Sequence, residues 1–475
     1  MTTHAYRIEH DLLGDRQVPA DAYYGIHTLR ALENFPITGT HISIYPEFIE
    51  ALACVKQAAA HANQDLGVLD EARAGAIIRA CREIRAGELH DQFVVDVIQG
   101  GAGTSTNMNA NEVIANRGLE LLGHLKGEYQ HLHPLDHVNL SQSTNDVYPT
   151  AINVALHFGL IRLLAAMAHL RHEFEIKAEA FADVIKMGRT QLQEAVPMTL
   201  GQEFSTYAVM LHEDEERLRE AALLIREVNL GATAIGTGIN TEPEYAALAC
   251  RYLADVSEVP VIVSPNLVEA TQDAGAFVQL SGVLKRVAVK LSKTCNDLRL
   301  LSSGPRAGFG EINLPPVQAG SSIMPGKVNP VIPEAVNQVA FEVIGNDVTV
   351  SFAAEGGQLQ LNAFEPIIAH SLFKSLKHLR QACFMLADRC VHGITANRER
   401  LRRMVEESIG LVTALNPYIG YENASMIAQE AQATGASVYE LVLRKGLLTQ
   451  AQLDDIMRPE SLTRPRSSRQ KHGQD

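Results

Sequence analysis

The length of the segments with helical periodicity constrains this chain most strongly. Apolar residues recur at steps of three and four along one stretch, which places them on a single stripe of a continuous helix. The stripe consists of Ile152, Leu156, Leu160, Leu163, Met167, Leu170 and Phe174. Similar patterns predict helices near 199–229, 267–302, 333–354 and 365–393. Helices of roughly 25 to 35 residues would be about 40 to 50 Å long, so they need neighbouring helices to cover them.

Several of these segments are apolar on more than one face, with Ala and Gly where helices would approach closely. A bundle that keeps apolar surface after folding usually buries it against other subunits, so we expect a homo-oligomer. We predict a mainly α protein in three parts: a mixed, mostly helical part over 1–142, the long-helix bundle over 143–396, and a small helical part with a polar tail over 397–475. Strand patterns are few and short.

Composition excludes several classes of partner. The net charge of −14 argues against nucleic acid or an anionic membrane, because a negative field repels polyanions. The N-terminus is polar, and no uninterrupted apolar run of about 18 residues is evident, so we expect a cytoplasmic protein. The six cysteines are scattered without a CxxC pair, which favours reduced core thiols. His131, His133 and His137 lie close together but lack a carboxylate or thiol at ligand spacing, so we predict no metal site.

Three stretches interrupt the helical pattern with small polar residues. They are GGAGTSTNMN at 100–109, LSQSTND at 140–146, and a loop over 303–333 that ends in AGSSIMPGKVNP. Glycines that allow close backbone approach, followed by hydroxyl and amide donors beside a helix start, suit the binding of an anion. Each of the first two stretches alone could also be a capped turn, and the third is the most specific. The loop of some 25 to 30 residues is long for a compact domain, and such loops are usually functional.

The motif GSSIMPGKVNP at 320–330 resembles the conserved loop of the superfamily that contains aspartases, fumarases, argininosuccinate lyases and adenylosuccinate lyases. The other two polar stretches match its remaining conserved regions in order and spacing, and the similarity to bacterial aspartases covers nearly the whole chain. The resemblance implies a three-domain helical subunit and a homotetramer with a 20-helix core. It also implies active sites built from three subunits, and reversible elimination of ammonia from L-aspartate to give fumarate.

The resemblance assigns roles to individual residues. Ser321 is the expected general base, acting as an alkoxide with support from backbone N–H groups and the Lys327 charge. The substrate-binding residues that it implies are Thr104, Ser143, Thr144, Asn145, Thr190, Gln191, Ser322 and Asn329. No cofactor is required by this chemistry, and activation by a divalent cation such as Mg²⁺ is left open. The expected small-molecule partners are L-aspartate, fumarate and ammonium.

Two alternatives remain at this point. One is a class II fumarase, which interconverts malate and fumarate, and the other is a catalytically silent structural protein on a lyase scaffold. Fumarases, and some aspartases, resemble the stretch GRTQLQEAVPMTLGQE at 188–203 but carry His at the position of Gln191. Glutamine there, and the continuation NPVIPEAVNQ at 329–338, match a subset of bacterial aspartases. Retention of Ser321, Lys327 and Asn329 argues against a silent protein.

Overall fold

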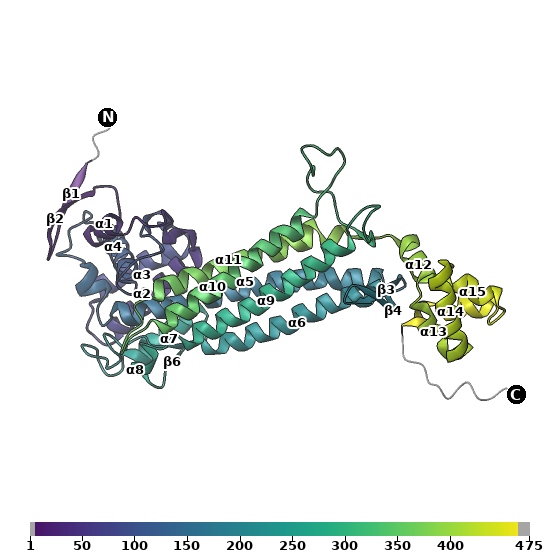
Figure 1. Ribbon diagram of the computed structural model, residues 1–475. Helices are drawn as coiled ribbons and strands as arrows, with labels where there is room; N and C mark the ends of the chain where they lie inside the picture. The colour runs from purple at the N-terminus through teal and green to yellow at the C-terminus, as the bar shows by residue number, and fades with distance from the viewer. Residues whose placement is uncertain (1–4, 464–475) are drawn as a thin grey trace. The chain divides into compact units, whose positions relative to one another are not determined.

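The computed structural model describes residues 5–463, and helices dominate it (Figure 1). Contacts divide the chain into two units, each made of three segments. The first comprises 1–165, 216–288 and 340–380, and the second comprises 166–215, 289–339 and 381–475. This division does not test the predicted three-part organisation, which stays a prediction. The polar tail beyond residue 463 lies outside the described residues.

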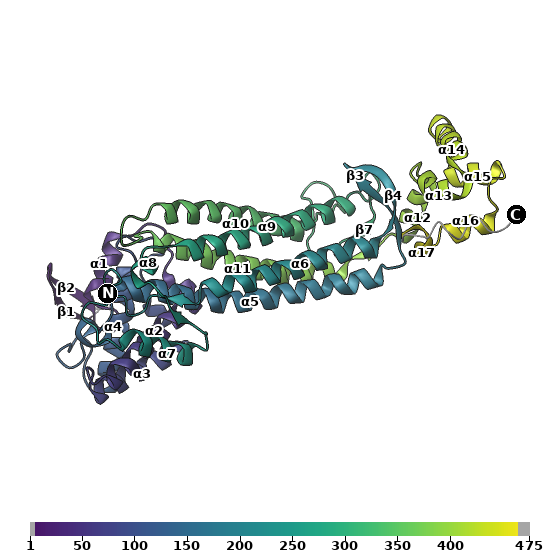
Figure 2. The same cartoon turned by 90° about the horizontal axis from the view of Figure 1, so that it is seen from below.

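Five long helices of 25 to 37 residues supply segments to both units. They are α5 (Thr144–Ala180), α6 (Leu200–Leu224), α9 (Gly275–Leu301), α10 (Val331–Glu355) and α11 (Glu365–Arg389). Figures 1 and 2 show their segments side by side within each unit. The apolar stripe predicted on α5 is confirmed, because all seven of its residues are buried. By length and composition α5 could cross a membrane, but 56% of its most apolar stretch is buried inside the protein, so helix packing accounts for that stretch.

Polar contacts join these helices laterally. In the second unit, Arg171 on α5 pairs with Glu215 on α6 at 2.9 Å, and Asn337 on α10 donates to Ser292 on α9 at 2.9 Å. In the first unit, the buried carboxylate of Asp347 on α10 accepts from Ser281 on α9 at 2.9 Å. Because buried polar groups need partners, these contacts add directional preferences to otherwise apolar packing.

The predicted helix over 267–302 is wrong in one respect. It divides into α8 (Leu267–Ala270) and α9, separated by residues 271–274. Asp273 explains the second start, because its side chain accepts from the N–H of Gly275, the first residue of α9, at 2.9 Å. The other long predicted helices are confirmed, with ends that differ by a few residues.

The remainder of the first unit consists of shorter elements. Its helices are α1 (Ile26–Asn34), α2 (Pro46–Asp65), α3 (Glu71–Arg85), α4 (Thr104–Leu121) and α7 (Tyr245–Ser257). The strands β1 (Tyr6–Asp11) and β2 (Gly14–Pro19) form an antiparallel hairpin, and β5 (Glu227–Val228) pairs in parallel with β6 (Ile262–Val263). Single turns of 3-10 helix lie at Ile42–Ile44 and His90–Gln92.

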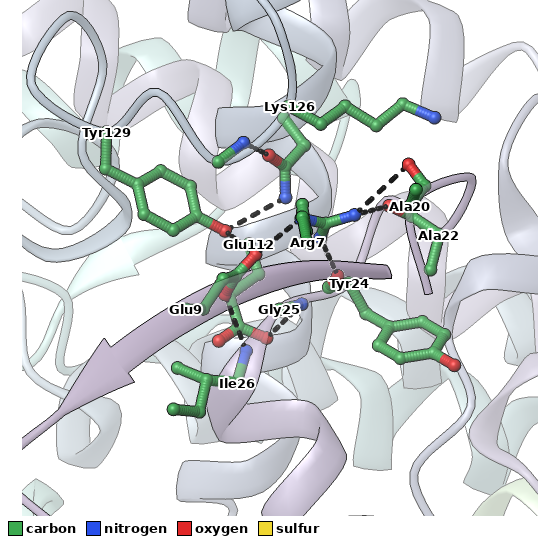
Figure 3. Close-up of polar contacts among 12 residues, drawn as sticks. Arg7, Glu9, Ala20, Ala22, Tyr24, Gly25, Ile26, Glu112, Lys126 and Tyr129 are labelled. Atoms are coloured by element: carbon green, nitrogen blue, oxygen red, sulfur yellow. Dashed lines mark hydrogen bonds and ion pairs between the residues drawn. The ribbon is translucent and has the colours of Figure 1, made fainter. Parts of the chain in front are cut away.

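A buried carboxylate on α4 holds the start of α1. Glu112 accepts from the backbone N–H groups of Gly25 and His27 at 2.8 Å and from Thr28 at 3.1 Å. Burial raises the pKa of Glu112 to about 7, although these donors favour the charged form. The N–H of Ile26, which lies between Gly25 and His27, donates instead to Glu9 on β1 at 2.8 Å (Figure 3). The hairpin and α1 are therefore fastened to α4 by acceptors placed at a helix N-terminus.

The remainder of the second unit carries two short sheets and the C-terminal helices. The strands β3 (Ile185–Thr190) and β4 (Gln193–Thr199) form a hairpin, and β7 (Ile312–Asn313) pairs with β8 (Thr395–Ala396). The helices are α12 (Arg398–Glu407), α13 (Leu411–Ile419), α14 (Tyr421–Thr434), α15 (Val438–Arg444), α16 (Gln450–Ile456) and α17 (Pro459–Leu462). The six cysteines are free and buried, as predicted.

Candidate active site

Two of the three polar stretches meet in the first unit. Three consecutive left-handed residues, Gly101, Ala102 and Gly103, turn the chain into α4, and a side chain at Gly103 would strike the ring of Tyr148. Thr104 is exposed at the start of α4, where its hydroxyl donates to the carbonyl of Gly101 at 2.7 Å.

One turn further along α4, the Asn107 amide donates to the hydroxyl of Thr144 at 3.0 Å, although the two residues are 37 positions apart. The structure therefore brings the predicted residues of 100–109 and 140–146 together.

Ser143 begins α5 as a cap. Its hydroxyl accepts from the N–H of Asn145 at 3.2 Å, while its own N–H donates to Asp146 Oδ1 at 2.9 Å. The second oxygen of Asp146 accepts from the N–H groups of Gly231 and Thr233, both at 3.0 Å. Burial raises the pKa of Asp146 to about 6, and the three amide donors oppose that shift by favouring the carboxylate. No motif or spacing in the sequence indicates that residues 231–233 belong to this site.

A proline inside α5 frees a carbonyl group beside the cap. Pro149 has no N–H and cannot donate the usual helical hydrogen bond to the carbonyl of Asn145, four residues earlier. The side chain of Asn229 takes that place, donating to the Asn145 carbonyl at 3.0 Å. The Asn145 amide in turn donates to the carbonyl of Ala234 at 2.7 Å. Asn145 is thus held at both ends by the 229–234 segment.

A buried lysine lies beneath the turn that precedes α5. The ammonium group of Lys56 donates to Asn139 Oδ1 and Gln142 Oε1, both at 2.9 Å. Asn139 Oδ1 also accepts from Asn107 at 3.1 Å, so one oxygen links the lysine to the start of α4. Burial lowers the pKa of Lys56 to about 7, while the charge of Asp146 acts in the opposite sense. Lys56 has no sequence signature of its own, because it lies in a helical segment rich in apolar residues.

The second unit carries Thr190 and Gln191 at the tip of the β3–β4 hairpin. Thr190 pairs with Gln193, and the two turn residues between them, Gln191 and Leu192, both have left-handed backbones, as a tight two-residue hairpin requires. Thr190 and Gln191 are exposed. The hairpin determines the positions of Thr190 and Gln191, whereas side-chain hydrogen bonds determine the positions of the candidate site residues in the first unit.

Glu311 joins the base of this hairpin to the base of the long loop. Its fully buried carboxylate pairs with Lys186 on β3 at 2.8 Å and with Arg189 on the same strand. Lys186 also pairs with Glu203 on α6. A buried charge is tolerated only when it is paired in this way. The loop over 302–330 is therefore rigidly held where it leaves α9, and the predicted loop between two long helices is confirmed.

The loop closes on itself around the predicted base. A side chain at Gly320 would overlap the backbone carbonyl of Lys327, and the Asn329 amide donates to the carbonyl of Gly320 at 3.3 Å. The hydroxyl oxygen of Ser321 accepts from the N–H groups of Ile323 and Met324 at 3.2 and 2.9 Å. Ser322 and Lys327 are exposed on the same loop. Two amide donors aimed at one hydroxyl oxygen favour negative charge on it.

Known proteins match this chain over nearly its full length. A family model described as Lyase matches residues 14–345, and one described as Fumarase C C-terminus matches residues 411–464. An aspartate ammonia-lyase from Pseudomonas canavaninivorans is 62% identical over 97% of this chain and 98% of its own. The aspartate ammonia-lyase from Escherichia coli (strain K12) is 58% identical over 97% of this chain and 96% of its own.

Solved structures agree with the sequence relatives. A crystal structure of a fumarate lyase:delta crystallin from Brucella melitensis, bound to cobalt, has a TM-score of 0.94 and 56% identity, covering 97% of this chain and all of its own. A recombinant class II fumarase from Schistosoma mansoni has a TM-score of 0.91 but only 35% identity, covering 98% of this chain and all of its own. The chain therefore shares its fold with a class II fumarase, while its sequence identity to the two aspartate ammonia-lyases is higher.

We predict that Lys56→Met removes the increase in the free energy of unfolding that the buried lysine causes as the pH rises above about 7. Below about pH 7 the lysine is protonated in the folded and unfolded states, so the cost of burying its charge is fully present. Above that pH the folded state releases the proton first, so the free energy of unfolding rises with pH up to about 10.5. Urea unfolding from pH 7 to 9 should show the parent gaining stability relative to Lys56→Met. Lys293→Met, at an exposed lysine, should track the parent, and parallel profiles for all three proteins would contradict the prediction.

Proposed function

We propose that this chain, which belongs to the lyase superfamily of aspartases and fumarases, is an aspartate ammonia-lyase that reversibly converts L-aspartate to fumarate and ammonia. The observation that carries the assignment is the identity of 58 to 62% to proteins of that activity, against 35% to a class II fumarase of the same fold. Gln191, where fumarases carry His, supports the same choice.

The reaction places one main demand on the site. The proton on C3 of aspartate is weakly acidic, and its removal puts a second negative charge on the neighbouring β-carboxylate. In the proposed mechanism Ser321 Oγ takes this proton, the electron pair forms the aci-carboxylate, and its collapse to the C2–C3 double bond expels the amine. Stabilisation of that dianion by donors placed in advance supplies the catalysis. The N–H groups of Ile323 and Met324 support the alkoxide form of Ser321 by their contacts with its oxygen.

The remaining site residues divide by the substrate group that they hold. We infer that hydroxyl donors bind the β-carboxylate, namely Thr104, Ser143, Thr144 and Ser322. A cation with two polar side chains binds the α-carboxylate, namely Lys327 with Thr190 and Asn329. Two amides, those of Asn145 and Gln191, lie near the amino group. A dianionic substrate on an acidic protein requires such a fixed cation.

We infer that the protein is a homotetramer whose active sites combine segments from different subunits. Along α10, Phe341, Val348 and Phe352 are 62%, 51% and 72% exposed at steps of seven and four, which places them on one face of the helix. Large apolar side chains on one face favour an interface between copies of the chain. The elimination itself needs no cofactor, and activation by a divalent cation and a cytoplasmic location remain proposals.

L-Aspartate should yield fumarate readily, measured by fumarate absorbance, and L-malate should yield almost none. A site arranged around the N–H donors of a substrate rejects an analogue that lacks them by ~10⁴-fold or more. In the reverse direction fumarate should react only when ammonia is supplied. Comparable turnover of malate would move the assignment to a fumarase, and no turnover of either substrate would favour a silent scaffold protein.

Ser321→Ala should lose nearly all turnover of aspartate while thermal unfolding stays close to that of the parent, because the hydroxyl is partly exposed and contacts only its own loop. Ser302→Ala is the matched control, since that hydroxyl lies at the start of the same loop and donates to Arg299 at 3.3 Å. The control should keep full activity. A Ser321→Ala protein with a tenth of the parent activity would show that another group is the base.

Shared active sites predict complementation between inactive variants. Lys327→Ala and Thr190→Ala proteins should each be nearly inactive, but mixing them during reversible subunit dissociation should restore part of the activity. Some sites in the hybrid tetramers would then receive both native residues. Mixing two batches of the same variant is the control. Hybrids verified by mass that remain inactive would argue against sites assembled from different subunits.

A further inference from the structure

We propose that His124, Glu128 and His131 form a binding site for a divalent transition-metal ion, with Zn²⁺ the best match to their donor atoms. The three residues lie on the connection between α4 and the single helical turn at Pro134–Val138, within the first unit. One ligand atom from each lies within 4.8 Å of the others. The site is separate from every residue assigned above to substrate binding or catalysis.

The three possible ligand atoms lie near enough to one another for a single ion. His124 Nδ1 is 3.6 Å from Glu128 Oε2, and two ligands of a tetrahedral zinc ion are about 3.4 Å apart. The rings of His124 and His131 stack with centroids 3.7 Å apart and planes 6° from parallel. The lone pairs of stacked rings lie in nearly parallel planes, so the exposed ring of His131 must turn out of the stack before both nitrogens can bind one ion. A water molecule would complete the coordination.

Hydrogen bonds hold the connection in place without an ion. Gly123 and Gly127, both with left-handed backbones, turn the chain so that His124 and Glu128 face each other. The side chain of Asn116 accepts from Gly127 N–H at 2.8 Å. Tyr129 donates to Glu9 at 3.0 Å, an anchor drawn in Figure 3.

The third ligand is held from outside the connection. Arg73 on α3 donates to the backbone carbonyl of His131 at 2.7 Å. Because the backbone is fixed at both ends, an ion would need to order only three side chains.

The donor set selects the class of metal. Two imidazole nitrogens and one carboxylate suit Zn²⁺, Co²⁺ or Ni²⁺, whereas Mg²⁺ requires oxygen ligands. The side chains of His124 and Glu128 are 33% and 37% exposed, so an ion can reach them from solvent.

This site replaces the histidine group that the sequence singled out. Among the described residues, His133 Nδ1 accepts from the N–H groups of Leu135 and Asp136 at 3.2 Å, and His137 Nδ1 accepts from His133 N–H at 2.8 Å. Those nitrogens are occupied in capping a helical turn. Of the three histidines considered at first, only His131 joins the new cluster.

The test uses the full-length protein after removal of bound metal with a chelator. Co²⁺ titration should give one ion per chain with the visible absorption of nitrogen-coordinated cobalt, and Zn²⁺ should displace it and raise the unfolding temperature. His131→Gln and Glu128→Gln should each weaken Co²⁺ binding by about tenfold or more. Glutamine at 128 can still accept the N–H of Leu125, which Glu128 accepts at 2.9 Å, so the connection should stay folded.

His172→Gln is the matched control, because that histidine is 66% exposed and lies 3.7 Å from Glu175 on α5. Its affinity for Co²⁺ should equal that of the parent. Absence of stoichiometric binding in the parent would overturn the proposal, and so would binding that survives both His131→Gln and Glu128→Gln. Turnover of aspartate should be unchanged in the two cluster variants, which separates this proposal from the proposed activity.

Discussion

The buried carboxylate of Asp146 fixes the start of the longest helix to a distant segment of the chain. One oxygen caps α5 through the N–H of Ser143, and the other accepts from Gly231 and Thr233, 85 and 87 residues away. Burying a carboxylate is costly unless donors surround it, and here three backbone amides do so. Residues 143–145, which carry hydroxyl and amide groups of the candidate site, are therefore positioned by Asp146 and the 231–233 segment.

A second buried ionisable side chain, that of Lys56, holds the turn that leads into α5. Lys56 is fully buried on α2, where burial disfavours its ammonium form. Its two acceptors, Asn139 and Gln142, belong to the turn that leads into α5. Because the oxygen of Asn139 also accepts from Asn107, one network connects the lysine to the starts of both α4 and α5. Removing any one of these side chains would leave buried polar groups without partners, which makes this region sensitive to substitution.

The second unit uses the same arrangement of a rigid base and an exposed tip. Glu311, paired with Lys186 and Arg189, holds the base of the β3–β4 hairpin and the start of the long loop. Thr190, Gln191, Ser322 and Lys327 extend from these bases as exposed groups. The proposed catalysis by donors placed in advance would require a firmly held backbone and accessible side chains, and the proposed site residues of the second unit have both. The proposed metal cluster follows it too, because hydrogen bonds fix the backbone while the ligands remain accessible.

Sequence alone determined the long helices of this protein, apart from the break between α8 and α9, and the loop that separates α9 from α10. Helical periodicity depends on residues three and four apart, and runs of Gly and Pro end helices locally, so both could be read without a structure. The motif around Ser321 led to the proposal of that residue as the base, and this role stays a prediction. Only the tertiary structure decided how these parts are supported. The partners of Asp146, Lys56 and Glu311 lie far along the chain, and no spacing rule encodes such pairs. The ligand group of His131 was also decided in three dimensions, because hydrogen bonding assigned His133 and His137 to a cap and left His131 beside His124 and Glu128.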